Sequence, residues 1–312
     1  MTGLDVFSVG AWALFDYILR ADHYPEEGET VELKMPSKLL HTRFFGDCSA
    51  NLAASAAATG VNVGLGMVVG DDFNRYGYRA HLLELGVDLS GVDVRSDADS
   101  GYNFNISDNR GRGMCFSHLG VAADQNDWAP PLQQIENSRV VAVSEKFSSY
   151  TLASIRHARE RGKTTVINGM VGTANQEAMK FLQAADYLFI SEKECKALLR
   201  VLDMSSAKDL LKAGLSTLVV TRGSEGSRWI TGEGEFHCDA VPCARIQDTT
   251  GAGDCFAGTA IGLIAQGASL QEAARIAAAA ASYVVEKWGC QTNLVGRERA
   301  ERRAKIYFEK GA

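Results

Sequence analysis

One segment of the chain leads from a loop directly into an apolar helix: DTTGAGDCFAG, residues 248–258, which continues as TAIGLIAQ. Gly251 and Gly253 leave backbone N–H groups uncovered at the start of this helix. Unpaired donors and the helix dipole favour an anion such as a phosphoryl group at that place. Asp254 follows in the first turn, although a carboxylate near a helix start is also simply a favourable charge placement. The segment by itself therefore indicates an anion site and leaves its purpose open.

A carboxylate beside an anion site is the pairing that phosphoryl transfer to an alcohol requires. Asp254 can accept the hydroxyl proton while N–H groups neutralise the charge on the transferred group. The sequence contains no GxxxxGK[ST] segment and no His-Arg-Asp or Asp-Phe-Gly element, so neither a Walker site nor a protein kinase is indicated. A dinucleotide-binding dehydrogenase is disfavoured as well, because VGAWALF near the start lacks the glycines of a pyrophosphate turn.

Outward from this segment, apolar stretches alternate between strand and helix character. Gly60 and Gly86 end helices predicted over residues 49–59 and 73–85, with the strand VNVGLGMVVG between them. Further strands are predicted at residues 139–143, 163–167, 187–190 and 217–221. They are mostly apolar, as expected when helices cover both faces of a parallel sheet. We therefore expect a single α/β domain over residues 1–312, with a central, mostly parallel sheet between helices.

Two segments depart from this alternation. Residues 14–45 and 100–118 carry turn-forming residues between short or alternating β stretches such as GETVELKM and YNFNIS. Two separate β-rich segments can pair into a small sheet over one edge of the main domain, where it would act as a lid. Ordinary surface hairpins are the alternative.

Composition and charge exclude several classes of protein. Of the 312 residues, 46% are hydrophobic and 22% are charged, which is the balance of a globular chain and not of a disordered or fibrous one. Lys and Arg total 32 against 38 Asp and Glu, a net charge of −6 without a basic block, so neither nucleic acid nor a membrane is expected as a partner. Seven cysteines without a CxxC pair suit reduced thiols, and the start of the chain lacks signal-peptide features. We expect a cytoplasmic protein.

At residues 248–258 the sequence resembles the ribokinase-like, or PfkB, family of carbohydrate kinases, whose signature has the form DTxGAGD. Other segments fall in the family's order: VFSVG, GET after Pro25, Gly46 through Asn51, VVGDDFNRYGYRAHLLELGVD, DNRGRG, VVTRGSEGS and GCQT. The resemblance implies a ribokinase-like fold with a small β lid, and Mg²⁺-dependent transfer of the γ-phosphoryl group of ATP to a hydroxyl of a small sugar. It makes Asp254 the catalytic base. It also implies an anion hole formed by Gly251, Ala252 and Gly253.

The resemblance also implies sites for ions and for the nucleotide. Asp248 and Thr250 match the place where many members hold a monovalent cation, here K⁺. Glu194 matches the Glu of the family's Asn-x-x-Glu motif, which organises Mg²⁺ and phosphates; Ser191 replaces the Asn, and Ser-x-x-Glu is also a helix capping box. Ala278 stands where many members place an Asn beside the adenine. The implied nucleotide contacts are Ser191, Thr221, Gly223 and Gly226.

On the acceptor side, Asp16 and Asn51 match family positions that bind hydroxyl groups, for which carboxylates and amides are suitable partners. Asp16 can alternatively be a turn residue. The full set of implied substrate contacts is Asp16, Gly46, Asp47, Asn51 and Glu145. Asp47 would repel a phosphorylated sugar and so favours an unphosphorylated one. Arg43 or Arg112 in the lid segments could instead clamp a phosphate.

Two other functions remain open. The first is a nucleoside kinase of the same fold, in which Tyr102 or Phe104 stacks on the base. The second is a non-catalytic sugar- or nucleotide-binding homologue, suggested by Ser191 and Ala278, although the intact GAGD segment argues against it. The expected partner is a small sugar or nucleoside, and a homodimer formed through the lid is expected as well.

Overall fold

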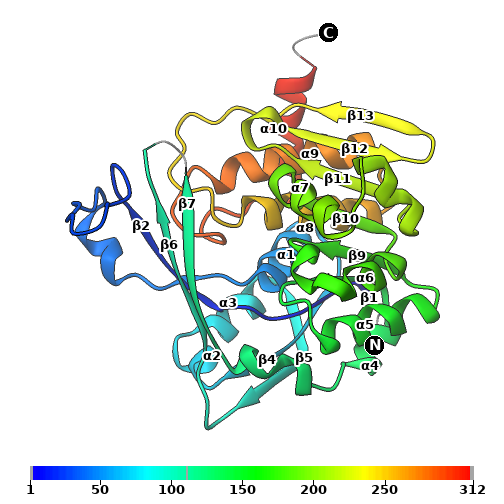
Figure 1. Cartoon of the computed structure of the whole chain (residues 1–312), viewed down its shortest axis with the longest axis horizontal. Coiled ribbons are helices and arrows are strands. Elements are labelled where there is room, and N and C mark those ends of the chain that lie inside the picture. Colours follow the sequence, from blue (N-terminus) through cyan, green and yellow to red (C-terminus); the bar gives the residue numbers. More distant parts are fainter. Residues whose placement is uncertain (1–2, 110–111, 310–312) are drawn as a thin grey trace.

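A computed structural model of the protein describes residues 3–109 and 112–309, in which a nine-stranded sheet lies between helices and a four-stranded sheet stands to one side (Figure 1). The order of the large sheet is β13-β12-β11-β10-β9-β8-β1-β4-β5. Its strands are β1 (Leu4–Val9), β4 (Val63–Gly70), β5 (Val87–Arg95), β8 (Ser138–Ser144), β9 (Thr164–Asn168), β10 (Tyr187–Ser191), β11 (Thr217–Thr221), β12 (Ser227–Thr231) and β13 (Gly234–Cys238). The pairs from β5 to β11 are parallel, and β12 and β13 add an antiparallel edge. The predicted α/β class is confirmed.

Successive side chains of a strand point to opposite faces of the sheet, and here both sets are apolar. Helices therefore cover both faces. In β1, Val6 belongs to one buried core and Phe7 to the other, and β8 divides Val140 and Val141 in the same way. The first face is covered by α1 (Cys48–Ala57), α8 (Ala252–Ala265) and α9 (Leu270–Val284), with α10 (Arg297–Phe308) packed on α9. The second face is covered by α4 (Leu132–Glu136), α5 (Ser149–Glu160), α6 (Ala178–Gln183) and α7 (Glu192–Val201).

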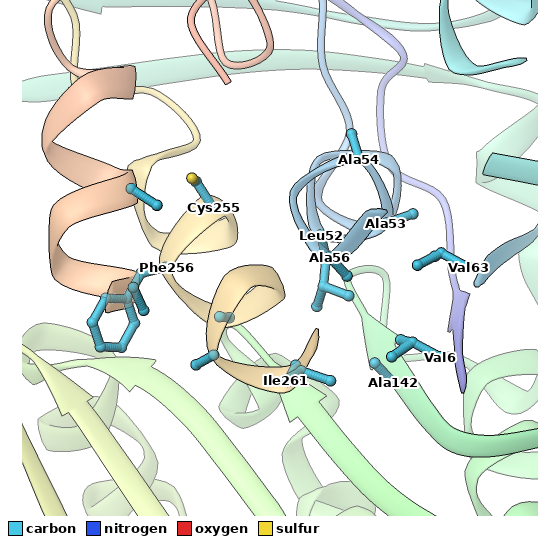
Figure 2. Packing of buried hydrophobic residues seen from close by; sticks show 14 of the residues in the cluster. Val6, Leu52, Ala53, Ala54, Ala56, Val63, Ala142, Cys255, Phe256 and Ile261 are labelled. Carbon is cyan, nitrogen blue, oxygen red and sulfur yellow. The ribbon is translucent and has the colours of Figure 1, made fainter. Parts of the chain in front are cut away.

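The α1 and α8 helices approach each other closely, because small residues line their contact. A Cβ atom at Gly258 of α8 would collide with the carbonyl oxygen of Leu52 in α1. Figure 2 shows the labelled residues of these two helices together with Val6 of β1, all within the first core. This close packing brings the N-terminal ends of the helices together, and these ends carry Asn51 and Asp254.

The two β-rich segments form one sheet in the order β3-β2-β6-β7. Its strands are β2 (Phe15–Arg20), β3 (Phe44–Phe45), β6 (Ser100–Ser107) and β7 (Gly113–Gly120). Because β2 pairs in parallel with β6, the segments do not form separate hairpins. Figure 1 shows β2, β6 and β7 standing beside the main body. Residues 110 and 111 of the second segment lie outside the described residues.

One predicted helix differs from the structure. Residues 73–85 contain part of α2 (Asp72–Arg75) and all of α3 (Tyr78–Glu84), separated at Gly77. Gly77 has a φ of 80°, a left-handed conformation that ends the first helix. Within the part of the chain that the structure describes, no helix combines the length and apolar character needed to cross a membrane.

Candidate active site

Asp254 lies in the first turn of α8, between two side-chain amides that come from other elements. Nδ2 of Asn51 donates to Oδ2 of Asp254 at 3.0 Å, and Nδ2 of Asn168, the last residue of β9, donates to Oδ1 at 2.8 Å. Burial raises the pKa of Asp254 to about 6; the two amides oppose this shift, and the charges of Glu194 and Asp16 add to it. The carboxylate is held in one orientation and titrates near neutral pH, as suits a general base.

The loop before Asp254 presents open backbone donors. Gly251 has a φ of 71°, and a Cβ atom there would lie 2.7 Å from Sγ of Cys290, so a side chain would not fit. No side chain caps α8, and the N–H groups of Gly253 and Asp254 have no partner among the described residues. Gly253 is exposed, and a Cβ atom there would meet nothing within 4 Å. These features fit a phosphoryl group beside Asp254.

Asp16 lies in the middle of a hydrogen-bonded cluster on the small sheet. It belongs to β2 and not to a turn, and its Oδ1 accepts from Nδ2 of Asn103 at 2.8 Å and of Asn105 at 2.9 Å. Sγ of Cys290 donates to Oδ2 at 3.5 Å, and a Cβ atom at Gly46 would collide with that oxygen. Burial raises the pKa of Asp16 to about 6, against the lowering effect of the amides. The predicted pair Asp16 and Gly46 is thus brought together.

The alternation of β6 decides which of its residues face Asp16. Asn103 and Asn105, which the sequence analysis did not identify, lie two residues apart on the face that bonds Asp16. Tyr102 and Phe104 therefore point from the opposite face, where Phe104 stacks on Tyr17 with ring centroids 5.3 Å apart. The base stacking expected of Tyr102 or Phe104 is not supported by this arrangement.

Asp47 caps α1. Its Oδ1 accepts from the N–H groups of Ser49 at 2.9 Å and Ala50 at 3.0 Å, and its Oδ2 accepts from the N–H of Trp12 at 2.6 Å. Burial raises its pKa to about 7. Both oxygens are turned toward the backbone, so the geometry supports neither the predicted substrate contact nor a repulsion aimed at the acceptor.

Asn51 is itself oriented by Gln291, which lies in the GCQT segment and had no predicted role. Its Oδ1 accepts from Nε2 of Gln291 at 2.9 Å, and the same Nε2 bonds the hydroxyl of Tyr78 at 2.6 Å. Oε1 of Gln291 lies 3.0 Å from Nε2 of His81. An ionised Asp254 can only accept hydrogen bonds, so the Asn51 amide must present its NH₂ group to Asp254 and its oxygen to Gln291. Gln291 must then donate its NH₂ group to Asn51 and present its oxygen to His81. Nε2 of His81 therefore carries a proton.

Glu145 lies at the carboxyl end of β8, near the base. Its Oε1 accepts from the N–H of Met170 at 2.9 Å. Burial raises the pKa of Glu145 to about 7, and the charges of Glu194 and Asp254 add to the shift. The substrate contact predicted for Glu145 stays a prediction.

The residues predicted for nucleotide binding gather at the ends of two neighbouring strands. Ser191 of β10 and Thr221 of β11 are partners in register. Ser191 accepts from the N–H of Glu194 at 3.3 Å, and Glu194 accepts from the N–H of Ser191 at 2.7 Å, so the capping box is present. Gly223 and Gly226, with φ values of 57° and 84°, bound the short turn after β11.

The residues predicted for a monovalent cation also lie together. Oδ1 of Asp248 accepts from the N–H of Thr250 at 3.0 Å and from its hydroxyl at 2.7 Å. Oδ2 of Asp248 accepts from the N–H of Gly289 at 3.0 Å. Asp248 thus ties the loop before α8 to the loop that follows α9.

The two arginines considered as phosphate clamps have other partners. Arg43 donates to the hydroxyl of Tyr17 at 2.9 Å, and its guanidinium lies 3.8 Å from the ring centroid of Tyr76. Arg112 donates to Oδ2 of Asp108 at 2.7 Å. Neither geometry supports a clamp on a sugar phosphate.

Comparison with known proteins places this arrangement in a family. A sequence profile of the pfkB family carbohydrate kinases matches residues 32–295. The nucleoside kinase of Methanocaldococcus jannaschii is 26% identical over 288 residues, 92% of each chain, and the ribokinase of Bacillus subtilis is 27% identical over 298 residues, 92% of this chain and 94% of that one. The crystal structure of the M. jannaschii nucleoside kinase superposes with a TM-score of 0.85, at 24% identity, over 97% of this chain and 98% of that one, which confirms the ribokinase-like fold. Since the profile covers most of the sequence, the chain belongs to the pfkB family of carbohydrate kinases, which are phosphotransferases acting on hydroxyl groups.

Proposed function

We propose that this protein is an ATP-dependent kinase that phosphorylates a hydroxyl group of a small, unphosphorylated sugar, with the sugar of a nucleoside as the alternative acceptor. One observation carries the proposal: Asp254 is oriented by Asn51 and Asn168 directly beside the open N–H groups of α8. The relatives named nucleoside kinase and ribokinase support both acceptor classes.

In the proposed reaction, Asp254 accepts the proton of the acceptor hydroxyl while the hydroxyl oxygen forms a bond to the γ-phosphorus of ATP. The bond from that phosphorus to the bridging oxygen breaks, and ADP leaves with the electron pair. The N–H groups of the Gly251–Gly253 loop stabilise the charge on the transferred group. Asp254 then releases its proton to solvent.

The acceptor would be held by Asp16, Gly46 and Asn51, with Glu145 at the opposite side. Asp16 is oriented by Asn103 and Asn105, which belong to the small sheet. A sheet that both carries binding residues and covers the acceptor excludes water, which would otherwise hydrolyse ATP. This supports the small sheet as a lid.

We propose Glu194, through water, as the residue that orients Mg²⁺ on the ATP phosphates. No group of three His, Cys, Asp or Glu within residues 3–109 and 112–309 is arranged to hold a metal ion. Mg²⁺ commonly keeps several waters and uses one or two carboxylates together with substrate phosphates, so Glu194 would suffice. The ion would neutralise phosphate charge. Ser191, Thr221, Gly223 and Gly226 would contact the nucleotide, and Asp248 with Thr250 would hold K⁺.

A second copy of this chain is the proposed partner of the outer face of the small sheet. Aromatic and apolar side chains gather there, and Phe116 is 59% exposed and Met114 47% exposed. Exposed patches of apolar side chains often mark protein–protein contact surfaces. Light scattering of the wild type and of Phe116→Glu tests this: a dimer that becomes a monomer is expected, and a monomeric wild type contradicts it.

The seven free cysteines support a cytoplasmic location.

The test of function is a screen for acceptor-dependent ADP formation with ribose, other neutral sugars and nucleosides, with the product identified by mass spectrometry. We expect one class to be phosphorylated, and Asp254→Asn to abolish the reaction. If ATP and a sugar both bind and no acceptor raises ADP formation, the protein is the non-catalytic homologue.

A further inference from the structure

A cleft of about 810 Å³ lies where the small sheet meets the loops around α8 and α9. This volume is enough for a small organic ligand. Phe44 and Trp288 contribute aromatic walls. The lining cations are Arg20, Lys34, Lys38, Arg245 and Lys287. Neither Asp254 nor the Gly251–Gly253 loop lines the cleft, which separates it from the anion site described above.

Most of the positive charge of this cleft has no ion-pair partner among the described residues. Glu286 is the one carboxylate among its lining residues, and it pairs with Arg303, which lies outside the lining, at 3.0 Å. Lys34 pairs with the exposed Glu32. Within the described ranges, four of the lining cations have no ion-pair partner: Arg20, Lys38, Arg245 and Lys287. In a chain of net charge −6, such a cluster is a local feature and does not reflect the general composition.

The cations stand on two sides of a junction. Arg20 ends β2 and Lys38 belongs to the segment between β2 and β3, whereas Arg245 precedes α8 and Lys287 follows α9. Nη1 of Arg20 donates to the carbonyl oxygen of Gln247 at 3.4 Å, so the two sides already touch here. Like charges facing each other oppose further closure, and an anion between them converts that repulsion into attraction.

We propose that this cleft binds a phosphate group, carried by an organic ester or free in solution, and that the bound phosphate draws the small sheet toward the main domain. Arginine and lysine are the side chains suited to phosphate. The aromatic walls would contact the organic part of an ester. The inference goes beyond the proposed kinase activity, because its residues play no part in the transfer step.

Titration calorimetry without ATP tests the site, with ribose 5-phosphate, ribose and inorganic phosphate as probes. Arg245→Gln and Lys38→Gln each remove one lining charge, and Arg302→Gln removes the same charge from an exposed position on α10. We expect ribose 5-phosphate to bind wild type and each cleft variant to weaken binding about fivefold, the effect of one exposed charge contact. Arg302→Gln should bind as wild type does.

The two sources of phosphate give different results. Ribose 5-phosphate binding without inorganic phosphate binding assigns the cleft to an ester. Equal binding of both probes assigns it to free phosphate. Absence of binding by either probe, or equal affinity in wild type and the cleft variants, overturns the proposal. Because ATP is absent, a failed kinase assay would not affect this result.

Closure is tested separately by small-angle scattering. The radius of gyration of the wild type should fall when the probe that binds in the titration, ribose 5-phosphate or inorganic phosphate, is added. For the double variant Lys38→Gln/Lys287→Gln it should stay constant. If the probe binds to the wild type and the radius of gyration does not change, the cleft is a phosphate site but the proposed closure of the small sheet is wrong.

Discussion

Asn51 and Asp254 are 203 residues apart in the chain, yet Nδ2 of the first lies 3.0 Å from Oδ2 of the second. The bond exists because α1 packs against α8 through Gly258, which has no side chain to hold the helices apart. Donation to the carboxylate favours its ionised form and so limits the rise in pKa that burial causes. The basicity of Asp254 is therefore set partly by a helix contact.

The first prediction concerns Asp254→Asn. The amide keeps the shape of the side chain but cannot accept a proton, so kcat should fall about 10²–10⁴-fold. The KM for ATP should stay within a few-fold, because the N–H groups of α8 are unchanged. Steady-state kinetics with an accepted sugar measure both, with exposed Asp97→Asn as the control. Retention of more than half the wild-type kcat would show that Asp254 is not the base.

The second prediction is a pH dependence. Asp254 must be ionised to act, and its pKa is raised to about 6, so kcat/KM should rise as the pH increases through about 6. Asp16 and Glu145 have pKa values of about 6 and 7, close to that of Asp254. The acid limb of the pH profile therefore reports the coupled titration of these three carboxyl groups. Asn168→Ala should move the limb upward, because it removes a donor that lowers the pKa of Asp254. A profile that is flat between about pH 5 and 8 contradicts this assignment.

The third prediction makes Gln291 a positioning residue. Gln291→Ala removes the donor to Oδ1 of Asn51, which frees the Asn51 amide to rotate away from Asp254. We expect kcat to fall about tenfold and the acid limb to shift upward. Gln266→Ala removes hydrogen bonds at the far end of α8 and serves as the control. A loss of thermal stability with an unchanged pH profile would leave Gln291 with a purely structural role.

The fold could be predicted because its signals are local. The apolar strands and the glycine after each helix identify α/β layering, and the two β-rich segments stand out by their turn residues. The break at Gly77 was missed, since a glycine inside a helical pattern is often tolerated. The strand β5 was not among the predicted strands. It lies at the edge of the large sheet and is only partly buried, so its residues are less uniformly apolar than those of the central strands.

The candidate site could be predicted only in part. The GAGD segment indicated Asp254 and its loop directly, whereas the contacts of Asn168 and Gln291 depend on tertiary packing. Gln291 lies in the GCQT segment, but that segment does not by itself indicate a contact with Asn51. A polar residue at the end of the strand TTVIN was the one signal for Asn168. Asp47 was assigned to substrate, although a carboxylate just before a helix is also the ordinary N-cap. Its hydrogen bonds to the N–H groups of Ser49 and Ala50 in α1 favour the cap.

The fourth prediction concerns the monovalent cation. If K⁺ binds at Asp248 and Thr250, it should order the loop that leads into the anion hole and raise the rate several-fold over a bulky organic cation. The comparison is made at equal ionic strength, and Asp248→Asn should remove the difference. Equal rates in the two cations for wild type would exclude a functional ion at this loop and leave the fold assignment unaffected.

The last prediction links the buried carboxyls to stability. Burial raises the pKa of Asp47 and Glu145 to about 7 and of Asp16 and Asp254 to about 6, all above their values in an unfolded chain. The folded protein therefore binds more protons than the unfolded chain between about pH 4 and 7, and the free energy of unfolding should fall as the pH rises through that window. A shift of this size corresponds to about 3–4 kcal/mol for a single group. Urea unfolding of the wild type and of Glu145→Gln at about pH 5 and pH 8 isolates one carboxyl, because the variant cannot titrate there. The variant should lose less stability between the two pH values than the wild type does, whereas Asp97→Asn should match the wild type. Equal losses in wild type and Glu145→Gln would show that Glu145 has the same pKa in the folded and unfolded chain, and that its burial is offset by a partner.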